Sequence, residues 1–308
     1  MRQDELSPRI RKRLRLGVSC SPSVVASRRS IIDELRYERT MIKIGCNYLS
    51  YKSVGIEVED FIRTCYDLRL DCLDFHLRAF PSTDVSYLLG IKRQCLDLGL
   101  PIGYLGVAGG FAGDEDTQRA RVEDAKAAID VALILGSPLI RVFGWQTQET
   151  ENRDPLFAAL ARCLREVSEY GAERGVVVAL QNHDNRNLAA TGPDCLRIIE
   201  NVDHPNFSFI MDTGQWLGSP GASGETDPDA DIYGYMEQTL PYASYVRCKF
   251  YKIASGTEEL LDYERIAGIL KAANYNGCIS IVYEGQEPDD RTELIGKADR
   301  YLRDLLAE

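Results

Sequence analysis

Apolar and polar positions alternate in blocks along most of this chain, and the blocks repeat eight times. Short apolar runs occur at 42–47, 72–77, 102–107, 139–144, 176–182, 207–212, 245–250 and 279–284. Longer stretches follow them at 58–69, 84–98, 116–136, 155–174, 192–201, 230–240, 262–274 and 290–306, with apolar residues recurring every three or four positions. The short runs are typical of buried strands and the longer stretches of amphipathic helices. Because strands that alternate with helices pair in parallel, the pattern predicts a parallel α/β fold.

Eight such units between residues 41 and 308 match the usual size of a closed (β/α)8 barrel, the TIM barrel. The alternative is an open doubly wound sheet, but neither GxGxxG nor GxxxxGK[ST] follows the first strand. The expected helix ends carry matching signals. Asp84 and Asp262 stand at N-cap positions, while Gly99, Gly136 and Gly175 stand where a left-handed residue ends a helix. We therefore predict one barrel over residues 41–308.

Residues 1–40 differ from the rest, with nine Arg and one Lys against five acidic residues, and we predict a basic N-terminal extension there. The whole chain has a formal net charge of −11, so the barrel itself is strongly acidic and repels polyanions. Nucleic acid is therefore not an expected partner. No apolar run reaches the roughly 18 residues of a membrane span, and no signal-peptide pattern opens the chain. We expect a cytoplasmic protein that does not bind a membrane.

The nine cysteines form no CxxC pair, which argues against both a disulfide framework and a structural zinc site.

The carboxyl ends of the strands are where a barrel of this kind places its chemistry, and alternate residues of a strand share one face. One parity per strand gives the candidate pocket residues His76, Arg141, Gln181, His183, Asp212, Arg247, Lys249 and Glu284. Burying unpaired charges costs several kcal/mol each, so stability alone does not account for this set. Asp212 is the strongest candidate, because the run FSFIMDTG brings an acid from an apolar strand into a glycine turn.

Ordinary structural roles are open to other members of the set. His76 can be a core histidine with its hydrogen bonds satisfied, Arg141 can bridge barrel carboxylates, and Glu284 can be a solvated loop residue. Trp145, Trp216 and Tyr283 lie near the strand ends and are candidates for stacking on a sugar, or for packing loops over the barrel mouth.

The runs GVVVALQNHDN, FSFIMDTGQW, YVRCKFYKI and LDYERIAGILKAANYNGCISIVYEG, in this order, resemble the xylose isomerase-like TIM barrel family of sugar phosphate isomerases and epimerases. The resemblance implies a metal site with a Glu, an Asp, a His and a Glu on strands five to eight. At those positions this chain has Gln181, Asp212, Arg247 and Val282. Lys249 is kept two residues beyond the histidine position, and Gln215 stands where a second histidine is frequent. Only Asp212 remains of the four implied ligands.

This departure puts the implied divalent cation, Mn²⁺ or Mg²⁺, in doubt, because such ions prefer carboxylate oxygens. We expect an atypical or absent metal, and if one binds, Asp212 and Gln181 hold it. The loss of both Glu ligands also argues against the two-base mechanism of the 3-epimerases.

An isomerase or epimerase that removes a proton next to a carbonyl remains the principal hypothesis. Arg247 and Lys249 then act as electrophilic stabilisers, and Glu284 or His183 is the base. Asp212 orients His183 or binds sugar hydroxyls. Substrate contacts come from His76, Arg141, Gln181, Gln215 and the three aromatic residues.

Other functions are compatible with the same pocket. One is a lyase or dehydratase that eliminates from a 3-keto-glycoside or an inosose, and another is a non-catalytic sugar-binding pseudoenzyme or subunit. An endonuclease would need a basic groove and a cluster of zinc ligands. This chain has an acidic barrel and only three histidines, so that function is disfavoured. In each remaining case the expected partner is a small sugar-like molecule, and the resemblance also implies a homo-oligomer.

Overall fold

The computed structural model describes residues 42–307, except 148, 150, 185 and 222–223. The predicted basic extension at 1–40 lies outside the described residues. The eight strands are β1 (Lys43–Asn47), β2 (Cys72–His76), β3 (Ile102–Gly106), β4 (Leu139–Val142), β5 (Val177–Gln181), β6 (Phe207–Asp212), β7 (Ala243–Phe250) and β8 (Cys278–Tyr283). They pair in parallel and close in the order β1 to β8, with β8 beside β1. The predicted closed barrel is confirmed.

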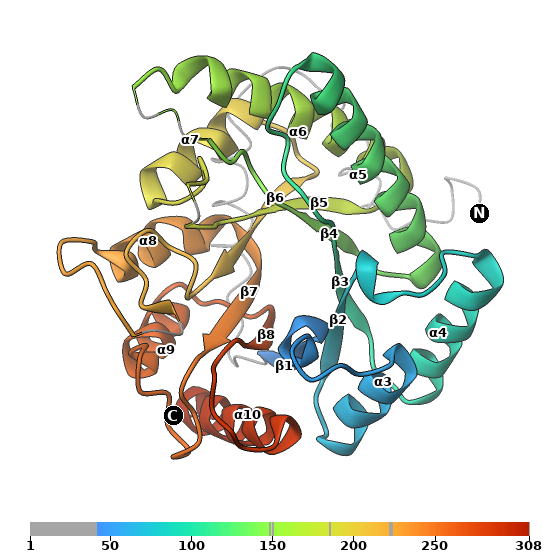
Figure 1. The fold of residues 1–308 in the computed structure, drawn as a ribbon, viewed down its shortest axis with the longest axis vertical. Coiled ribbons are helices and arrows are strands. Elements are labelled where there is room, and N and C mark those ends of the chain that lie inside the picture. Colours follow the sequence, from blue (N-terminus) through green and yellow to red (C-terminus); the bar gives the residue numbers. More distant parts are fainter. Residues whose placement is uncertain (1–41, 148, 150, 185, 222–223, 308) are drawn as a thin grey trace, which may run out of the picture.

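The helices surround the barrel as an outer ring (Figure 1). They are α3 (Val58–Asp67), α4 (Val85–Asp97), α5 (Glu115–Leu135), α6 (Asp154–Arg174), α7 (Gly192–Val202), α8 (Ile232–Thr239), α9 (Tyr263–Ala272) and α10 (Arg291–Ala307). Short 3₁₀ helices, η2 (Tyr48–Tyr51), η3 (Leu77–Ala79) and η5 (Leu240–Tyr242), precede or follow strands. Among the described helices, none is long and apolar enough to cross a bilayer.

Several helix ends follow the signals read from the sequence. Asp262 caps α9 by accepting the backbone N–H of Arg265, and Gly136 and Gly175 end α5 and α6 in the left-handed region. Asp84 occupies the N-cap of α4, but its side chain makes no capping hydrogen bond.

Two apolar layers hold the barrel. The larger lies between strands and helices, and the smaller, with Tyr104, Ile210 and Tyr245, fills the barrel interior. Gly103 in β3 makes room in that interior, because a Cβ there would collide with the Asp74 carboxylate and the Tyr245 ring.

Candidate active site at the carboxyl ends of the strands

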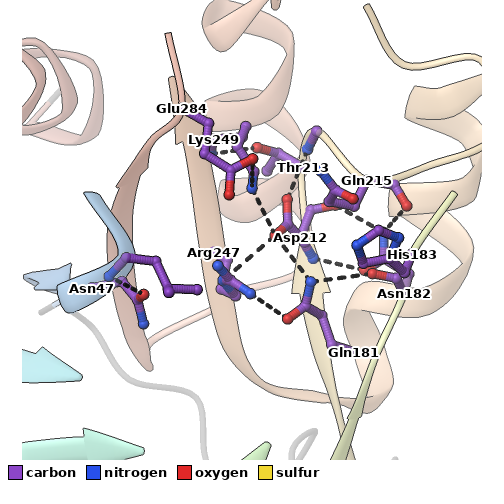
Figure 2. Close-up of polar contacts among 12 residues, drawn as sticks. Asn47, Gln181, Asn182, His183, Asp212, Thr213, Gln215, Arg247, Lys249 and Glu284 are labelled. Atoms are coloured by element: carbon purple, nitrogen blue, oxygen red, sulfur yellow. Dashed lines mark hydrogen bonds and ion pairs between the residues drawn. The ribbon is translucent and has the colours of Figure 1, made fainter. Parts of the chain in front are cut away.

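Asp212, the last residue of β6, is the centre of the candidate site and is fully buried. Its Oδ2 lies 3.4 Å from Arg247 Nε and 3.5 Å from Lys249 Nζ, both on β7 (Figure 2). Gln181 Nε2 donates to the same oxygen at 3.2 Å, and Oδ1 accepts the backbone N–H of Gly214 at 3.1 Å. One carboxylate therefore faces two buried cations.

Asn182 holds the backbone around Asp212 in place. Its Oδ1 accepts the N–H of Asp212 at 2.7 Å, and its Nδ2 donates to the carbonyls of Asp212 at 2.9 Å and Gln215 at 3.0 Å. Thr213 adds a tie to β7 by accepting the backbone N–H of Lys249 at 2.9 Å. Asn182 is not among the predicted pocket residues, because it alternates along the chain with the inward-facing Gln181 and His183. A fully buried Asn directly after a strand is nonetheless a positioning residue here.

Glu284 follows β8 and forms the outer edge of the cluster. Its Oε2 lies 2.9 Å from Lys249 Nζ, with 41% of the Glu284 side chain exposed and only 2% of the Lys249 side chain. The Lys249 charge lowers the pKa of Glu284; desolvation opposes this, and the hydrogen bond to Lys249 and the charges of Arg247 and His183 add to the lowering. Glu284 is therefore ionised at neutral pH and reachable from the barrel mouth.

His183 lies beside this cluster, half-buried after β5. Its Nδ1 lies 3.2 Å from Asp184 Oδ1, and its ring meets Phe143 edge-on with centroids 5.2 Å apart. The expectation that Asp212 orients His183 is not what the structure shows, because Asp184 pairs with the imidazole while Asp212 faces the β7 cations.

His76 and Arg141 lie on the β2–β4 side of the barrel, flanking Gly106 of β3, which is register partner to both. Burial, and next the charge of Arg141, lower the pKa of His76 to about 3, so this imidazole is neutral. Burial and the charge of Arg247 lower the pKa of Arg141 to about 10. Arg141 stacks on Phe143, 4.1 Å from the ring centroid.

The aromatic residues predicted to contact a sugar do not lie beside the charged cluster. Trp216 packs on Phe209 of β6 and Tyr235 of α8, and the Tyr283 hydroxyl donates to Glu287 at 3.1 Å. Both rings lie in the layer between strands and helices, away from the charged cluster. Trp145 is also buried in that layer.

Gln215 is closer to the cluster than these rings, because Asn182 binds its carbonyl. Its Oε1 is buried and accepts no hydrogen bond from the residues that the structure describes.

A second polar network lies inside the barrel and was not predicted from the sequence. Asp74 Oδ1 accepts the Tyr245 hydroxyl at 2.8 Å and the Tyr104 N–H at 3.2 Å, and Asn47 donates to the Tyr104 hydroxyl at 2.7 Å. Burial raises the pKa of Asp74 to about 7, although its hydrogen bonds and Arg247 act in the opposite direction. The signal was the shared parity of Asp74 and His76, which places both side chains inside the barrel.

A sequence profile of the xylose isomerase-like TIM barrel family matches residues 65–305. The chain belongs to this family. Among solved structures of similar fold is D-allulose 3-epimerase from Methylomonas sp., with a TM-score of 0.68 and 17% identity over 87% of this chain and 99% of that one. D-psicose 3-epimerase from Clostridium cellulolyticum H10, solved with D-tagatose, has a TM-score of 0.70 and 16% identity over 86% and 99%.

A third similar structure, 3-keto-D-glucoside 4-epimerase from E. coli, has a TM-score of 0.63 and 19% identity over 85% of this chain and 99% of that one. No curated protein matches the sequence significantly. At these identities the solved structures share the barrel fold with this chain and leave its activity to be argued from its own residues.

The metal ligands that the resemblance implies for the xylose isomerase-like family are not matched by the donors present. Gln181 uses its amide oxygen to accept a hydrogen bond from Arg247 Nη1, while Arg247 and Lys249 crowd the Asp212 oxygen that a cation would need. Within the described ranges, no three His, Cys, Asp or Glu side chains gather as a metal-binding group. A guanidinium and an ammonium repel a dication, so these residues do not fit the ion.

Proposed function

We propose that this member of the family is an isomerase or epimerase of a sugar, keto-sugar or cyclitol that works by proton abstraction next to a carbonyl without a metal. The observation that carries the proposal is the chain of contacts from Arg247 through Asp212 and Lys249 to Glu284. It joins two fixed cations to one accessible, ionised carboxylate. Such a site supplies a base, Glu284, in direct contact with an oxyanion stabiliser, Lys249.

In the proposed reaction, the substrate carbonyl oxygen lies against Arg247 and Lys249. Glu284 removes the proton from the neighbouring carbon, and the electron pair of the broken C–H bond forms an enediolate whose negative oxygen faces the two cations. Return of the proton to the former carbonyl carbon gives the isomer, with the proton of the neighbouring hydroxyl passing to the former carbonyl oxygen so that a new carbonyl forms on the carbon that lost its C–H bond. Return of the proton to the opposite face of the original carbon gives the epimer. Asp212 keeps the two cations together through both steps, since without it they would repel each other.

Glu284 is the preferred base over His183 because of its contacts. Its lowered pKa keeps it ionised over the whole neutral range, and Lys249 lies at hydrogen-bond distance from it. His183 is bound to Asp184 and lies at the side of the cluster. We assign His183 the role of a substrate contact or second proton carrier.

The test is C–H exchange in D₂O, followed by NMR, with a panel of keto-sugars, 3-keto-glycosides and inososes. We expect exchange with at least one substrate, unchanged by a chelator, and a loss of about 10²-fold to 10⁴-fold in Glu284→Gln. The matched control is Glu293→Gln, which breaks an exposed pair of the same length, 2.9 Å between Lys297 and Glu293 on α10. It should leave the exchange rate unchanged.

Three outcomes would overturn the proposal. Tight sugar binding with no exchange identifies a non-catalytic sugar-binding protein, and an unsaturated product with release of a leaving group identifies a lyase. Exchange that disappears on chelation and returns with Mn²⁺ shows a metal mechanism.

A further inference from the structure

Arg141 is a buried guanidinium with only part of its hydrogen-bonding capacity used. Only 1% of the residue is exposed. Its Nη1 donates to the carbonyl of Val107 at 3.2 Å, while its Nε is buried with no hydrogen-bond partner in the described part of the chain. Nη2 has no acceptor among the described residues, and no described carboxylate lies within ion-pair distance of this side chain. The free edge is therefore the one that carries the Nε and Nη2 protons side by side.

A second hydrogen-bond donor lies beside that edge. Gly106 lets the guanidinium lie close to the β3 backbone, since a Cβ there would lie 2.7 Å from Arg141 Nη2 and 3.3 Å from His76 Cδ2. The Nδ1 of His76 accepts the backbone N–H of Arg78 at 3.2 Å. Because the pKa of His76 is lowered to about 3, the ring is neutral and carries its one N–H on Nε2. An arginine edge and an imidazole donor thus flank one glycine.

The charges of the site leave Arg141 uncompensated. Arg247 and Lys249 are matched by Asp212 and Glu284, at 2.9 to 3.5 Å. Arg141 has no such partner, and its pKa is lowered, which is the expected direction for a buried cation with another cation near it. An unpaired buried charge costs several kcal/mol, so the free protein carries a penalty that one negative charge on a ligand would remove.

We propose that Arg141 binds an anionic group of the substrate, a carboxylate or a phosphate, through its Nε and Nη2 edge, so that the protein acts on an acidic sugar in preference to a neutral one. Two parallel N–H groups match two oxygens of a carboxylate or phosphate, which a hydroxyl does not provide. The assignment of a sugar rests on the proposed function, whereas the anion site is testable without any reaction.

The first experiment measures anion binding alone, by thermal unfolding at constant ionic strength with glycolate, inorganic phosphate or uncharged ethylene glycol. We expect one of the two anions to raise the Tm of the wild type, and ethylene glycol to leave it unchanged. A larger effect of glycolate identifies a carboxylate site, and a larger effect of phosphate identifies a phosphate site. The stabilisation should be lost in Arg141→Gln and retained in Arg174→Gln. Arg174 is a matched control because it also stacks on an aromatic ring, Tyr170, but has its own carboxylate partner, Asp130.

The same variant separates a binding role from a structural one. Because Arg141→Gln removes an uncompensated buried charge, its Tm without ligand should equal or exceed that of the wild type. Arg141→Lys keeps the charge but lacks the two-proton edge, and should bind the preferred anion at least about 10-fold more weakly. A lower Tm in Arg141→Gln, or equal stabilisation by anions in the wild type and both variants, overturns the proposal.

The second experiment compares D-fructose, D-fructuronate and D-fructose 6-phosphate, which differ only at C6, by competition with the preferred small anion. One of the charged pair should compete at least about 10-fold better than fructose in the wild type, and equal competition by all three overturns the inference. If anions bind as expected but C–H exchange is absent, the proposed function fails and the anion site stands. If neutral sugars exchange at the same rate in wild type and Arg141→Gln, and charged sugars do not exchange, the function stands and the anion site fails.

Discussion

Asp212 forms ion pairs with two cations through one carboxylate, so its removal should affect the fold as well as the chemistry. Asp212→Asn leaves Arg247 buried without a counter-charge, and leaves Lys249 with only the partly exposed Glu284 as its partner. We expect a loss of about 3–5 kcal/mol in the free energy of unfolding, measured with denaturant. Glu284→Gln is the comparison, and because 41% of that side chain is exposed, it should lose less than about 1 kcal/mol. Equal losses in the two variants would contradict the central position given to Asp212.

Asp74 should make stability depend on pH in the direction opposite to most carboxylates. Its pKa is raised from 3.8 to about 7 in the folded protein. The unfolded chain therefore ionises first, and the contribution of the protonated group to stability is complete below pH 3.8 and is lost as the pH rises to about 7. Asp74→Asn keeps an acceptor for Tyr245 and cannot ionise, so it should become more stable relative to the wild type as the pH rises from 4 to 8.

The size of this effect follows from about 1.4 kcal/mol per pKa unit, which gives a few kcal/mol in total. The measurement is the difference in unfolding free energy between variant and wild type at several pH values. A difference that stays constant between pH 4 and pH 8 would show that Asp74 is ionised throughout in the folded protein.

At the scale of the elements, the helices were the most predictable part of this chain. The bounds of α9, predicted at 262–274, are Tyr263–Ala272, because Asp262 caps the first turn and the apolar spacing ends near Ala272. The 3₁₀ helices η2 and η3 were not predicted, because three or four residues are too few to show a period.

Strand parity was predictable, but strand alignment was not. Phe209 of β6 pairs with Ala243 of β7, whereas Ile210 pairs with Tyr245, so one residue of β7 is skipped. Without this shift Asp212 would lie opposite Val246. With it, Asp212 lies opposite Arg247, and the ion pair forms. No pattern of apolar residues in either run indicates the irregularity, so the sequence predicted two inward side chains without predicting that they are partners.

Replacing either of two glycines on adjacent elements by alanine should change the free energy of unfolding, in opposite directions at the two positions. Gly103→Ala in β3 forces a methyl group into the Asp74 carboxylate and the Tyr245 ring, and should cost at least about 1–3 kcal/mol. Gly90 lies on the exposed side of α4 with nothing within 4 Å of an added Cβ, so Gly90→Ala should gain about 0.5–1 kcal/mol through helix propensity. Denaturant titration of both variants checks the pair. A neutral Gly103→Ala would mean that the barrel interior has more room than these contacts allow.

For the whole molecule, the barrel and the polar pocket at its mouth were predictable from eight repeated units and strand parity. The interior network was harder, because Asp74 and Tyr245 are 171 positions apart and meet only when the barrel closes. The aromatic contacts show the same limit. Tyr283, the last residue of β8, has outward parity, whereas Trp216 lies in the loop after β6, where strand parity no longer applies; both rings pack toward the helices.

Removal of metal ions should leave the stability of the whole molecule unchanged. Since the Asp212 cluster is neutralised by side chains alone, dialysis against a chelator should shift neither Tm nor the unfolding midpoint, and added Mn²⁺ or Mg²⁺ should produce no saturable stabilisation at the site. Differential scanning calorimetry of dialysed and metal-supplemented protein provides the measurement. A saturable rise in Tm with Mn²⁺ that is lost in Asp212→Asn would contradict this prediction.

The hydrogen bond from Arg247 to Gln181 also limits the mutational routes that lead from this site to a metal centre. Gln181→Glu alone would add a carboxylate against Arg247 and form a stronger ion pair, which holds the cation in place. Arg247→His alone would remove a counter-charge of Asp212 while Gln181 still supplies only an amide. Neither single substitution assembles a metal site, so the two positions depend on each other, and a metal centre here requires both changes together with a carboxylate at Val282.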